Sequence, residues 1–388
     1  MRASLSRRLV LGGLAGSALW RGGHAAEAAA HALTVGCWGG AYAAALRAVV
    51  DAPLATEAGV SVQQATSGEQ ERIARITAPG TQARLDVVLI SDVDAYRLSL
   101  RQVFRPVTTA GVGDLPHVLP ALRVPYGVPQ AQTAMCVVYN PAKVRTAPRG
   151  FTALFEAART GQAGFSSELA VHNLAAAAVT RSAGPASLEG AKSIFTALKK
   201  AGKLRLYPDN EALGQALASG EIAMAPMWRS RAYVWRQGGR ELRCVTPVEG
   251  AIPFVILGCV PHAGAHTGGP QTGGPQTGGP QTGGPQTGGP QTGGPQTGGS
   301  QTGGSPTGGS PTAAAMLYLE RLLRPDVQGE MARRLGLLPT VDTAHIDRKL
   351  LQQIGFTGAQ RARFRPLSLD AVARNGVSLR QFWNHELA

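Results

Sequence analysis

The stretch LDVVLISDVDAY, residues 85–96, decides the class of fold. Its first six residues, 85–90, are almost all aliphatic, and the polar pair Ser91–Asp92 follows at once. A short apolar run bounded by loop residues is typical of a strand that is buried on both faces of a parallel sheet. Ser91 or Asp92 can accept a hydrogen bond from a backbone N–H as an N-cap, so we expect a helix to begin there. Strand and helix therefore follow one another directly, as in a βαβ unit.

The same order of short apolar run, loop and helix recurs along most of the chain. The strands expected are at 33–37, 60–64, 85–90, 134–139, 222–227 and within 251–261. The helices expected are at 41–50, 69–76, 151–160, 169–181, 188–200, 210–220, 313–323 and 327–335, with mixed helix and loop after residue 348. This alternation indicates an open α/β sheet. The 388 residues correspond to about two domains.

Residues 1–32 have the layout of an export signal. Arg7 and Arg8 form a charged region, an apolar segment of about 12 residues follows at 9–20, and small residues come next around 26–32. The apolar segment is too short to cross a bilayer as a helix, which takes about 20 residues. The sequence SRRLVL at 6–11 resembles the twin-arginine export motif, with an ordinary secretory signal as the alternative. Either signal would carry the mature protein out of the cytoplasm.

Charge and motif content exclude several classes of function. The formal net charge is +14, but the basic residues are scattered and not interleaved with aromatic residues, so nucleic-acid binding is not expected. The four cysteines form no CxxC pair and the histidines lack ligand spacing, so no metal site or cofactor is expected. The chain holds no G-x-S-x-G or H-E-x-x-H motif and no paired catalytic carboxylates, which argues against an enzyme.

Five stretches in order carry a family resemblance. They are LTVGCWGGAY (33–42), LDVVLISDVDAY (85–96), YGVPQAQTAMCVVYNPAKV (126–144), ASGEIAMAPMWRSRAYVW (218–235) and AAAMLYLERLLRPDVQGEMARRLGLLPT (313–340). Together they resemble the periplasmic solute-binding proteins of ABC importers, of the spermidine/putrescine type. The resemblance implies an α/β fold with two lobes joined by two crossing hinge strands and a solute in the cleft. It also implies a periplasmic protein that is a monomer, has no enzymatic activity and delivers its solute to a membrane permease.

The resemblance also implies a division of the chain. Lobe one would comprise 33–128 plus 252–345, and lobe two 129–251. The crossing strands would lie within 126–139 and 244–260. Residues 346–388 would form a C-terminal helical tail.

Most candidate ligand-binding residues follow the strands, where open α/β sheets bind their ligands, and Phe254 is added by the resemblance. They are Trp38, Tyr42, Ser67, Ser91, Asp92, Glu168, Trp228, Arg229 and Phe254. In the polyamine-binding relatives, aromatic rings enclose the alkyl chain and carboxylates hold the ammonium ends. Trp38, Trp228 and Phe254 match the aromatic positions of that pattern, and Glu168 falls near an acidic one.

Other positions depart from the pattern of the relatives. Ile256 stands where they carry an acid, and Val93 where they carry an aromatic residue. Arg229 and Arg231, if they face the cleft, would repel a diamine and attract a carboxylate. The solute therefore stays open between a polyamine-like and a carboxylate- or amino-acid-like molecule.

A structural role is the alternative for several of these residues. Trp38 and Tyr42 could simply pack the helix at 41–50 against the sheet, and Arg229 and Arg231 could face solvent. Two further functions also stay open: an exported enzyme on the same fold, and a periplasmic sensor or scaffold that binds a receptor.

A TGGPQ repeat occupies residues 267–312 and decays to TGGSP near its end. It contains no charge and no large apolar side chain, so it cannot offset an ordering cost of about 1–2 kcal/mol per residue. We expect a disordered insertion in a tolerant loop of lobe one, with a sticky spacer as the alternative.

Overall fold

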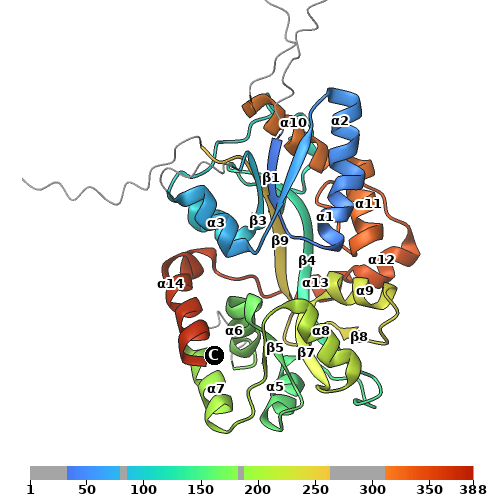
Figure 1. Ribbon diagram of the computed structural model, residues 1–388. Helices are drawn as coiled ribbons and strands as arrows, with labels where there is room; N and C mark the ends of the chain where they lie inside the picture. The colour runs from blue at the N-terminus through green and yellow to red at the C-terminus, as the bar shows by residue number, and fades with distance from the viewer. Residues whose placement is uncertain (1–32, 79–84, 182–187, 263–310, 388) are drawn as a thin grey trace, which may run out of the picture. The chain divides into compact units, whose positions relative to one another are not determined.

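The computed structural model describes residues 33–78, 85–181, 188–262 and 311–387 (Figure 1). The export signal predicted at 1–32 and the TGGPQ repeat up to residue 310 lie outside the described residues. Among the described helices, none combines the length and the apolar character needed to cross a bilayer. All four cysteines are free thiols.

The main sheet has seven strands in the order β2-β1-β3-β9-β4-β7, with β8 paired to β4. The bounds are β1 Leu33–Cys37, β2 Val62–Thr66, β3 Val87–Ser91, β4 Val128–Tyr139, β7 Met224–Trp228, β8 Arg243–Val245 and β9 Ile252–Cys259. The pairs β1–β2 and β1–β3 are parallel, whereas β9 runs antiparallel to both β3 and β4, and β4 antiparallel to β7 and β8. The prediction of a parallel sheet is therefore right only for β1 to β3. A small second sheet pairs β5 (Phe165–Ser166) with β6 (Leu206–Tyr207).

Helices follow most strands. Those of the first half are α1 Ala41–Leu46, η1 Arg47–Asp51, α2 Ala52–Ala58, α3 Glu69–Thr77, α4 Asp92–Ser99, η2 Leu115–His117 and η3 Pro120–Leu122. The middle of the chain forms α5 Phe151–Arg159, η4 Ser167–Leu169, α6 Ala170–Ala178, α7 Leu188–Lys200, α8 Asn210–Ser219 and α9 Arg229–Gln237. The last part forms α10 Pro311–Leu323, α11 Pro325–Leu335, α12 Arg348–Ile354, α13 Gly358–Arg361, α14 Leu369–Gln381 and η5 Phe382–Leu387. The helix α10 thus begins within the last two residues of the predicted insertion.

The long strands β4 and β9 run side by side through the middle of the sheet (Figure 1). The first part of β4, from Val128 to Met135, pairs with β9, and its last part, from Met135 to Tyr139, pairs with β7 and β8. At the same time β9 pairs with β3 over Ile256 to Cys259. These two strands therefore connect two groups of α/β elements, one around β1, β2 and β3 and the other around β7 and β8, as expected of crossing strands.

Two local features explain the chain path. Ser91 ends β3 and caps α4, because its hydroxyl accepts a hydrogen bond from the Asp94 N–H at 3.3 Å. Of the two predicted caps, Ser91 is thus the one used. Gly127, at the start of the first crossing, leaves no room for a side chain, since an added Cβ would lie 2.6 Å from the Cys259 Sγ.

Candidate functional site

A cavity of about 330 Å³ lies where strand ends and helix starts from both groups of elements meet. Its lining includes Trp38, Tyr42, Glu69, Ser91, Val93, Asp94, Glu168, His172, Trp228, Arg231, Phe254, Ile256, Leu337, Arg380 and Asn384. These residues come from the ends of β1, β3 and β7, from the starts of α1, α3, α4 and α9, from η4, α6, β9, α14 and η5, and from the segment after α11. The position agrees with the rule that open α/β sheets bind ligands beyond their strand ends.

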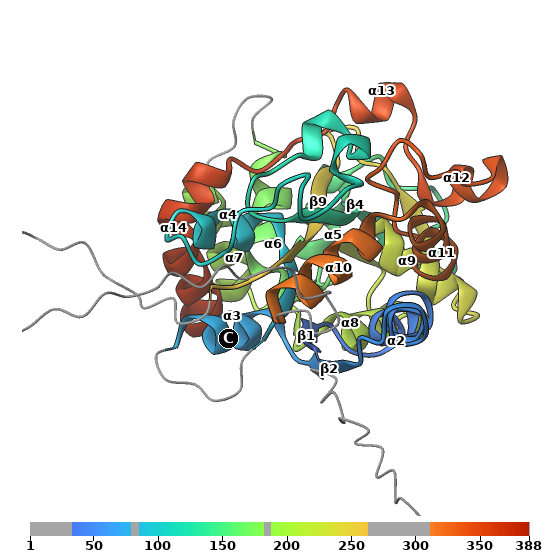
Figure 2. The same ribbon diagram turned by 90° about the horizontal axis from the view of Figure 1, so that it is seen from above.

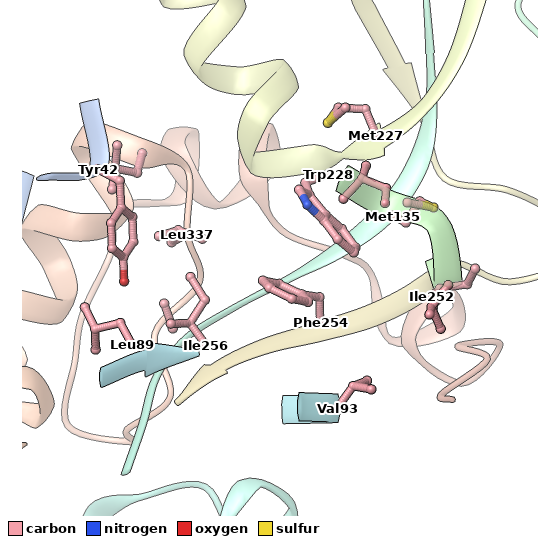
Figure 3. Packing of buried hydrophobic residues seen from close by; sticks show 14 of the residues in the cluster. Tyr42, Leu89, Val93, Met135, Met227, Trp228, Ile252, Phe254, Ile256 and Leu337 are labelled. Carbon is pink, nitrogen blue, oxygen red and sulfur yellow. The ribbon is translucent and has the colours of Figure 1, made fainter. Parts of the chain in front are cut away.

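One wall of the cavity is aromatic. The rings of Trp228 and Phe254 stack with centroids 4.5 Å apart at 24°, and Figure 3 shows them lying against each other. The His172 ring meets Trp228 edge-on at 4.7 Å and Phe254 at 5.8 Å. Burial lowers the pKa of His172 to about 4, so the ring is neutral at pH 7. Such a wall can bury the apolar part of a ligand and also attract a cation to the ring faces.

A second pair of rings lies nearer the β1 end of the cavity. Trp38 and Tyr42 meet edge-on with centroids 5.5 Å apart. The Tyr42 hydroxyl donates to Gln130 Oε1 at 2.8 Å, and the Arg72 guanidinium lies 4.3 Å from the centre of the Trp38 ring. Both predicted aromatic residues therefore pack within the protein and also line the cavity.

Glu69, the first residue of α3, presents a carboxylate to the cavity. Its Oε1 accepts hydrogen bonds from the Ser91 N–H at 2.8 Å and from the Ser91 hydroxyl at 2.5 Å. Burial, with repulsion from Asp94, raises the pKa of Glu69 to about 7. No ion pair to Glu69 is found among the described residues. The carboxylate is thus held in place by hydrogen bonds but not neutralised by a side chain.

Asp94 also lines the cavity, but unlike Glu69 it forms ion pairs with side chains. Its Oδ1 pairs with Arg97 Nε at 3.0 Å and with Arg380 Nη2 at 3.2 Å, and its Oδ2 accepts from Gln70 Nε2 at 3.2 Å. Only 6% of its side chain is exposed. Two guanidinium groups therefore share this one carboxylate.

Another part of the cavity lining carries one carboxylate, Glu168, and one guanidinium group, Arg231. Glu168 accepts a hydrogen bond from Asn210 Nδ2 at 2.7 Å, and burial raises the pKa of its carboxyl. Burial lowers the pKa of the Arg231 guanidinium, which the charges of Glu211 and Glu168 partly counteract. In the described structure the Nε2 of His172 has no hydrogen-bond partner and is buried. These polar groups line the same cavity as Glu69 and can also contact a ligand.

Six of the nine predicted residues line the cavity. They are Trp38, Tyr42, Ser91, Glu168, Trp228 and Phe254. Ser67 does not line it, although its carbonyl oxygen accepts a hydrogen bond from Arg72. Asp92 does not line it either, because its carboxylate turns back to accept from the Val93 N–H at 3.0 Å, and burial raises its pKa to about 7.

Arg229 also lies outside the cavity lining. Arg229 and Arg231 lie at the start of α9, where residues two apart point in different directions. Arg229 therefore faces α12 and the start of the second crossing, with Nε donating to the Gln353 carbonyl at 3.2 Å and its guanidinium 5.0 Å from the Phe356 ring centre. Arg231 takes the place in the cavity that was expected of Arg229.

The charged and polar lining residues that sequence reasoning missed include Glu69, Asp94, His172 and Arg380. Glu69 lies two residues after the predicted site residue Ser67, at the start of the helix predicted at 69–76, so its position was a usable signal. No comparable local signal marks the other three. No group of three or more metal-binding side chains is found in the described parts of the chain.

The sequence of the chain matches a known protein family. Residues 51–349 match the family described as bacterial extracellular solute-binding protein. No curated protein sequence matches the chain.

Solved structures of the same architecture are numerous. A GABA receptor structure matches with a TM-score of 0.69 and 17% identity, covering 92% of this chain and 98% of that one. The PBP MotA from A. tumefaciens B6, in complex with glucopine, matches with a TM-score of 0.69 and 12% identity, covering 92% and 100%. A spermidine/putrescine ABC transporter protein from Listeria monocytogenes matches with a TM-score of 0.62 and 12% identity, covering 92% and 99%. At these identities the likeness shows the fold, and the predicted two-lobed α/β class is confirmed.

Proposed function

The chain belongs to the family of bacterial extracellular solute-binding proteins of ABC transporters, and from this premise we propose that it captures a small solute bearing an organic ammonium group. Proteins of this family bind their solutes without transforming them. The proposed solute would occupy the cavity between the two groups of elements and pass from there to a membrane permease.

The observation that carries this proposal is the Glu69 carboxylate. It lines the cavity, two hydrogen bonds from Ser91 hold it in place, and no side-chain cation of the described structure pairs with it. Its raised pKa reflects the cost of keeping a negative charge there. A ligand ammonium beside Glu69 would remove that cost, because an opposite charge nearby favours the ionised form.

The aromatic wall supports the same class of solute. Trp228 and Phe254 offer stacked ring faces, and the neutral His172 adds an edge and a free ring nitrogen. An alkyl chain gains about 0.8 kcal/mol for each CH₂ group that is buried. A cation over a ring gains about 0.5–2 kcal/mol more. A short alkylammonium would use both contributions.

The other end of the solute meets Glu168 and Arg231, one acid and one base. Both a polyamine and an amino acid fit such a wall by charge. The names of similar structures span the same range, since they include a GABA receptor and a spermidine/putrescine ABC transporter protein.

We further propose the layout expected from the sequence: lobe one at 33–128 plus 252–345, lobe two at 129–251, and a monomer exported to the periplasm through its signal at 1–32. The two crossings would act as the hinge. Solute contacts with both lobes would then favour the closed state over the open one.

A thermal-shift screen of monoamines, diamines, amino acids and carboxylic acids, followed by isothermal titration calorimetry, tests the proposal. We expect amine-bearing compounds to stabilise the protein and simple carboxylic acids not to. Glu69→Gln is expected to abolish the shift, whereas Glu156→Gln, at an exposed position on α5, should leave it unchanged. Stabilisation by carboxylic acids alone would overturn the proposal.

A further inference from the structure

The C-terminal segment formed by α14 and η5 lies beyond the residues that match the family, which end at 349. It nevertheless contributes two residues to the cavity, Arg380 and Asn384. The helix α14 packs against α4 (Figure 2) and also against α6, and η5 packs against α7. Part of the cavity lining therefore comes from a part of the chain that the family match does not cover.

Contacts with both groups of elements hold this segment in place. Near its start, the Tyr96 hydroxyl of α4 donates to the Asp370 carboxylate. Near its end, the Trp383 side chain is 1% exposed and meets the Phe195 ring of α7 edge-on at 4.9 Å. The segment is thus fixed at both ends, so the position of Arg380 between them is defined by packing and not by a loose tail.

Arg380 changes the charge of the wall beside Glu69. Without it, Asp94 and Arg97 would balance each other; with it, the group of Asp94, Arg97 and Arg380 carries one excess positive charge, which is no longer balanced once a ligand ammonium has paired with Glu69. Asp94 is also made unavailable to a ligand ammonium, because its carboxylate is already engaged by both guanidinium groups and by Gln70. Glu69 has no ion pair with a side chain of the described residues and remains available to a ligand ammonium.

We propose that Arg380 determines which solutes the cavity accepts: by occupying Asp94 it limits this wall to one ammonium group and favours a carboxylate at the other end of the solute. The inference rests on the proposed amine-binding function and narrows it to compounds with one ammonium and one carboxylate. A second ammonium is repelled by the excess charge at Arg380, whereas a carboxylate is attracted to it.

Two probes of equal length test this inference: 4-aminobutanoate and butane-1,4-diamine. They share one ammonium end and differ in the other, so the ratio of their dissociation constants reports the charge preference of the site. Isothermal titration calorimetry with the full mature chain should show the amino acid binding at least about tenfold more tightly, as expected for one unit charge at close range. Arg380→Gln should move the ratio toward the diamine by about tenfold or more.

Three further variants give the controls. Arg374→Gln, at an exposed position on the same helix, and Arg380→Lys, which keeps the charge, should both retain the wild-type ratio. Asp94→Asn leaves two unbalanced guanidinium groups and should move the ratio further toward the amino acid. If Arg380→Gln does not fold, Asp94→Asn decides the question by itself.

The outcomes separate the two proposals. A wild-type protein that binds neither probe nor any other amine refutes the proposed function and this inference with it. A wild-type protein that binds amines but prefers the diamine, or an Arg380→Gln variant with an unchanged ratio, refutes the role of Arg380 alone.

Discussion

Replacement of Glu69 by glutamine is the most direct test of the site. Glutamine keeps the size of the side chain and an oxygen that can accept from Ser91, but it removes the charge. In the free protein, burial and the repulsion from Asp94 raise the pKa of Glu69 to about 7, although the hydrogen bond from Ser91 and the charge of Arg72 act in the other direction. The variant therefore separates the charge of the carboxylate from its position.

The expected loss of affinity follows from Coulomb's law. Two unit charges 4 Å apart attract by about 4 kcal/mol at an effective dielectric constant of about 20. Desolvation of the solute ammonium offsets part of this, so we expect a net loss of about 2–3 kcal/mol, or about 30- to 150-fold in dissociation constant. The wild-type affinity should also fall about tenfold from pH 8 to pH 6, since protonated Glu69 must lose its proton before it can pair with an ammonium.

The free protein should show the opposite dependence on pH. A carboxyl whose pKa is raised on folding, here from 4.5 to about 7, contributes stability that is complete below pH 4.5 and lost as the pH rises through 7. Glu69→Gln should therefore raise the free energy of unfolding of the unliganded protein at pH 8, by up to about 3 kcal/mol, and change it little at pH 4.

Calorimetric titration of the tightest-binding amine at pH 6, 7 and 8, in buffers of different ionisation enthalpy, measures both the affinity and the protons released. The wild type should release a fraction of a proton at pH 7, and Glu69→Gln none from this position. A variant that binds within about threefold of the wild type and keeps the same pH dependence would refute the assignment of Glu69 as the ammonium partner.

Three further predictions concern the rest of the molecule. Trp228→Ala removes the ring stacked on Phe254 and should weaken amine binding by about 10- to 100-fold in calorimetry; an unchanged affinity would exclude Trp228 from the contact. Gly127→Ala places a Cβ against the Cys259 Sγ and should lower the free energy of unfolding by about 1–3 kcal/mol, as measured by urea denaturation. An unaltered denaturation midpoint would contradict this expectation. Replacement of residues 267–312 by a short Gly–Ser bridge should leave the affinity unchanged, because closing a loop costs little more when the loop is long; a large loss would show that the repeat contributes to binding.

Much of the fold could be predicted because the decisive signals are local. The strand at 33–37 and the helix at 188–200 have the predicted bounds, since both are marked by periodicity and by neighbouring loop residues. The direction of β9 could not be predicted in this way. An apolar run at 251–261 reads the same whether its neighbours run parallel or antiparallel to it, and only its pairing with both β3 and β4 decides.

The residues of the candidate site could also be predicted only in part. Trp228 and Phe254 were predicted because the family resemblance implies aromatic residues at their positions, whereas the choice between Arg229 and Arg231 depends on where α9 begins. One residue of uncertainty at a helix start turns a side chain by about 100°. Arg380 lies 286 residues from Asp94, so their ion pair depends on the packing of α14 against α4 and has no counterpart in the local sequence.

The register of β9 explains why a solute in this cavity would sense both halves of the fold. Ile256 pairs with Ser91 of β3, the residue that holds Glu69, while Phe254, two positions earlier on the same face, pairs with Thr133 of β4. The ring of Phe254 is therefore carried by the crossing strand itself and reaches Trp228 at the end of β7. A solute anchored at Glu69 alone would leave the second half of the fold unaffected. Only a solute long enough to reach Trp228 as well can favour one arrangement of the halves over another, because a ligand shifts a conformational equilibrium only through its differential affinity for the two states.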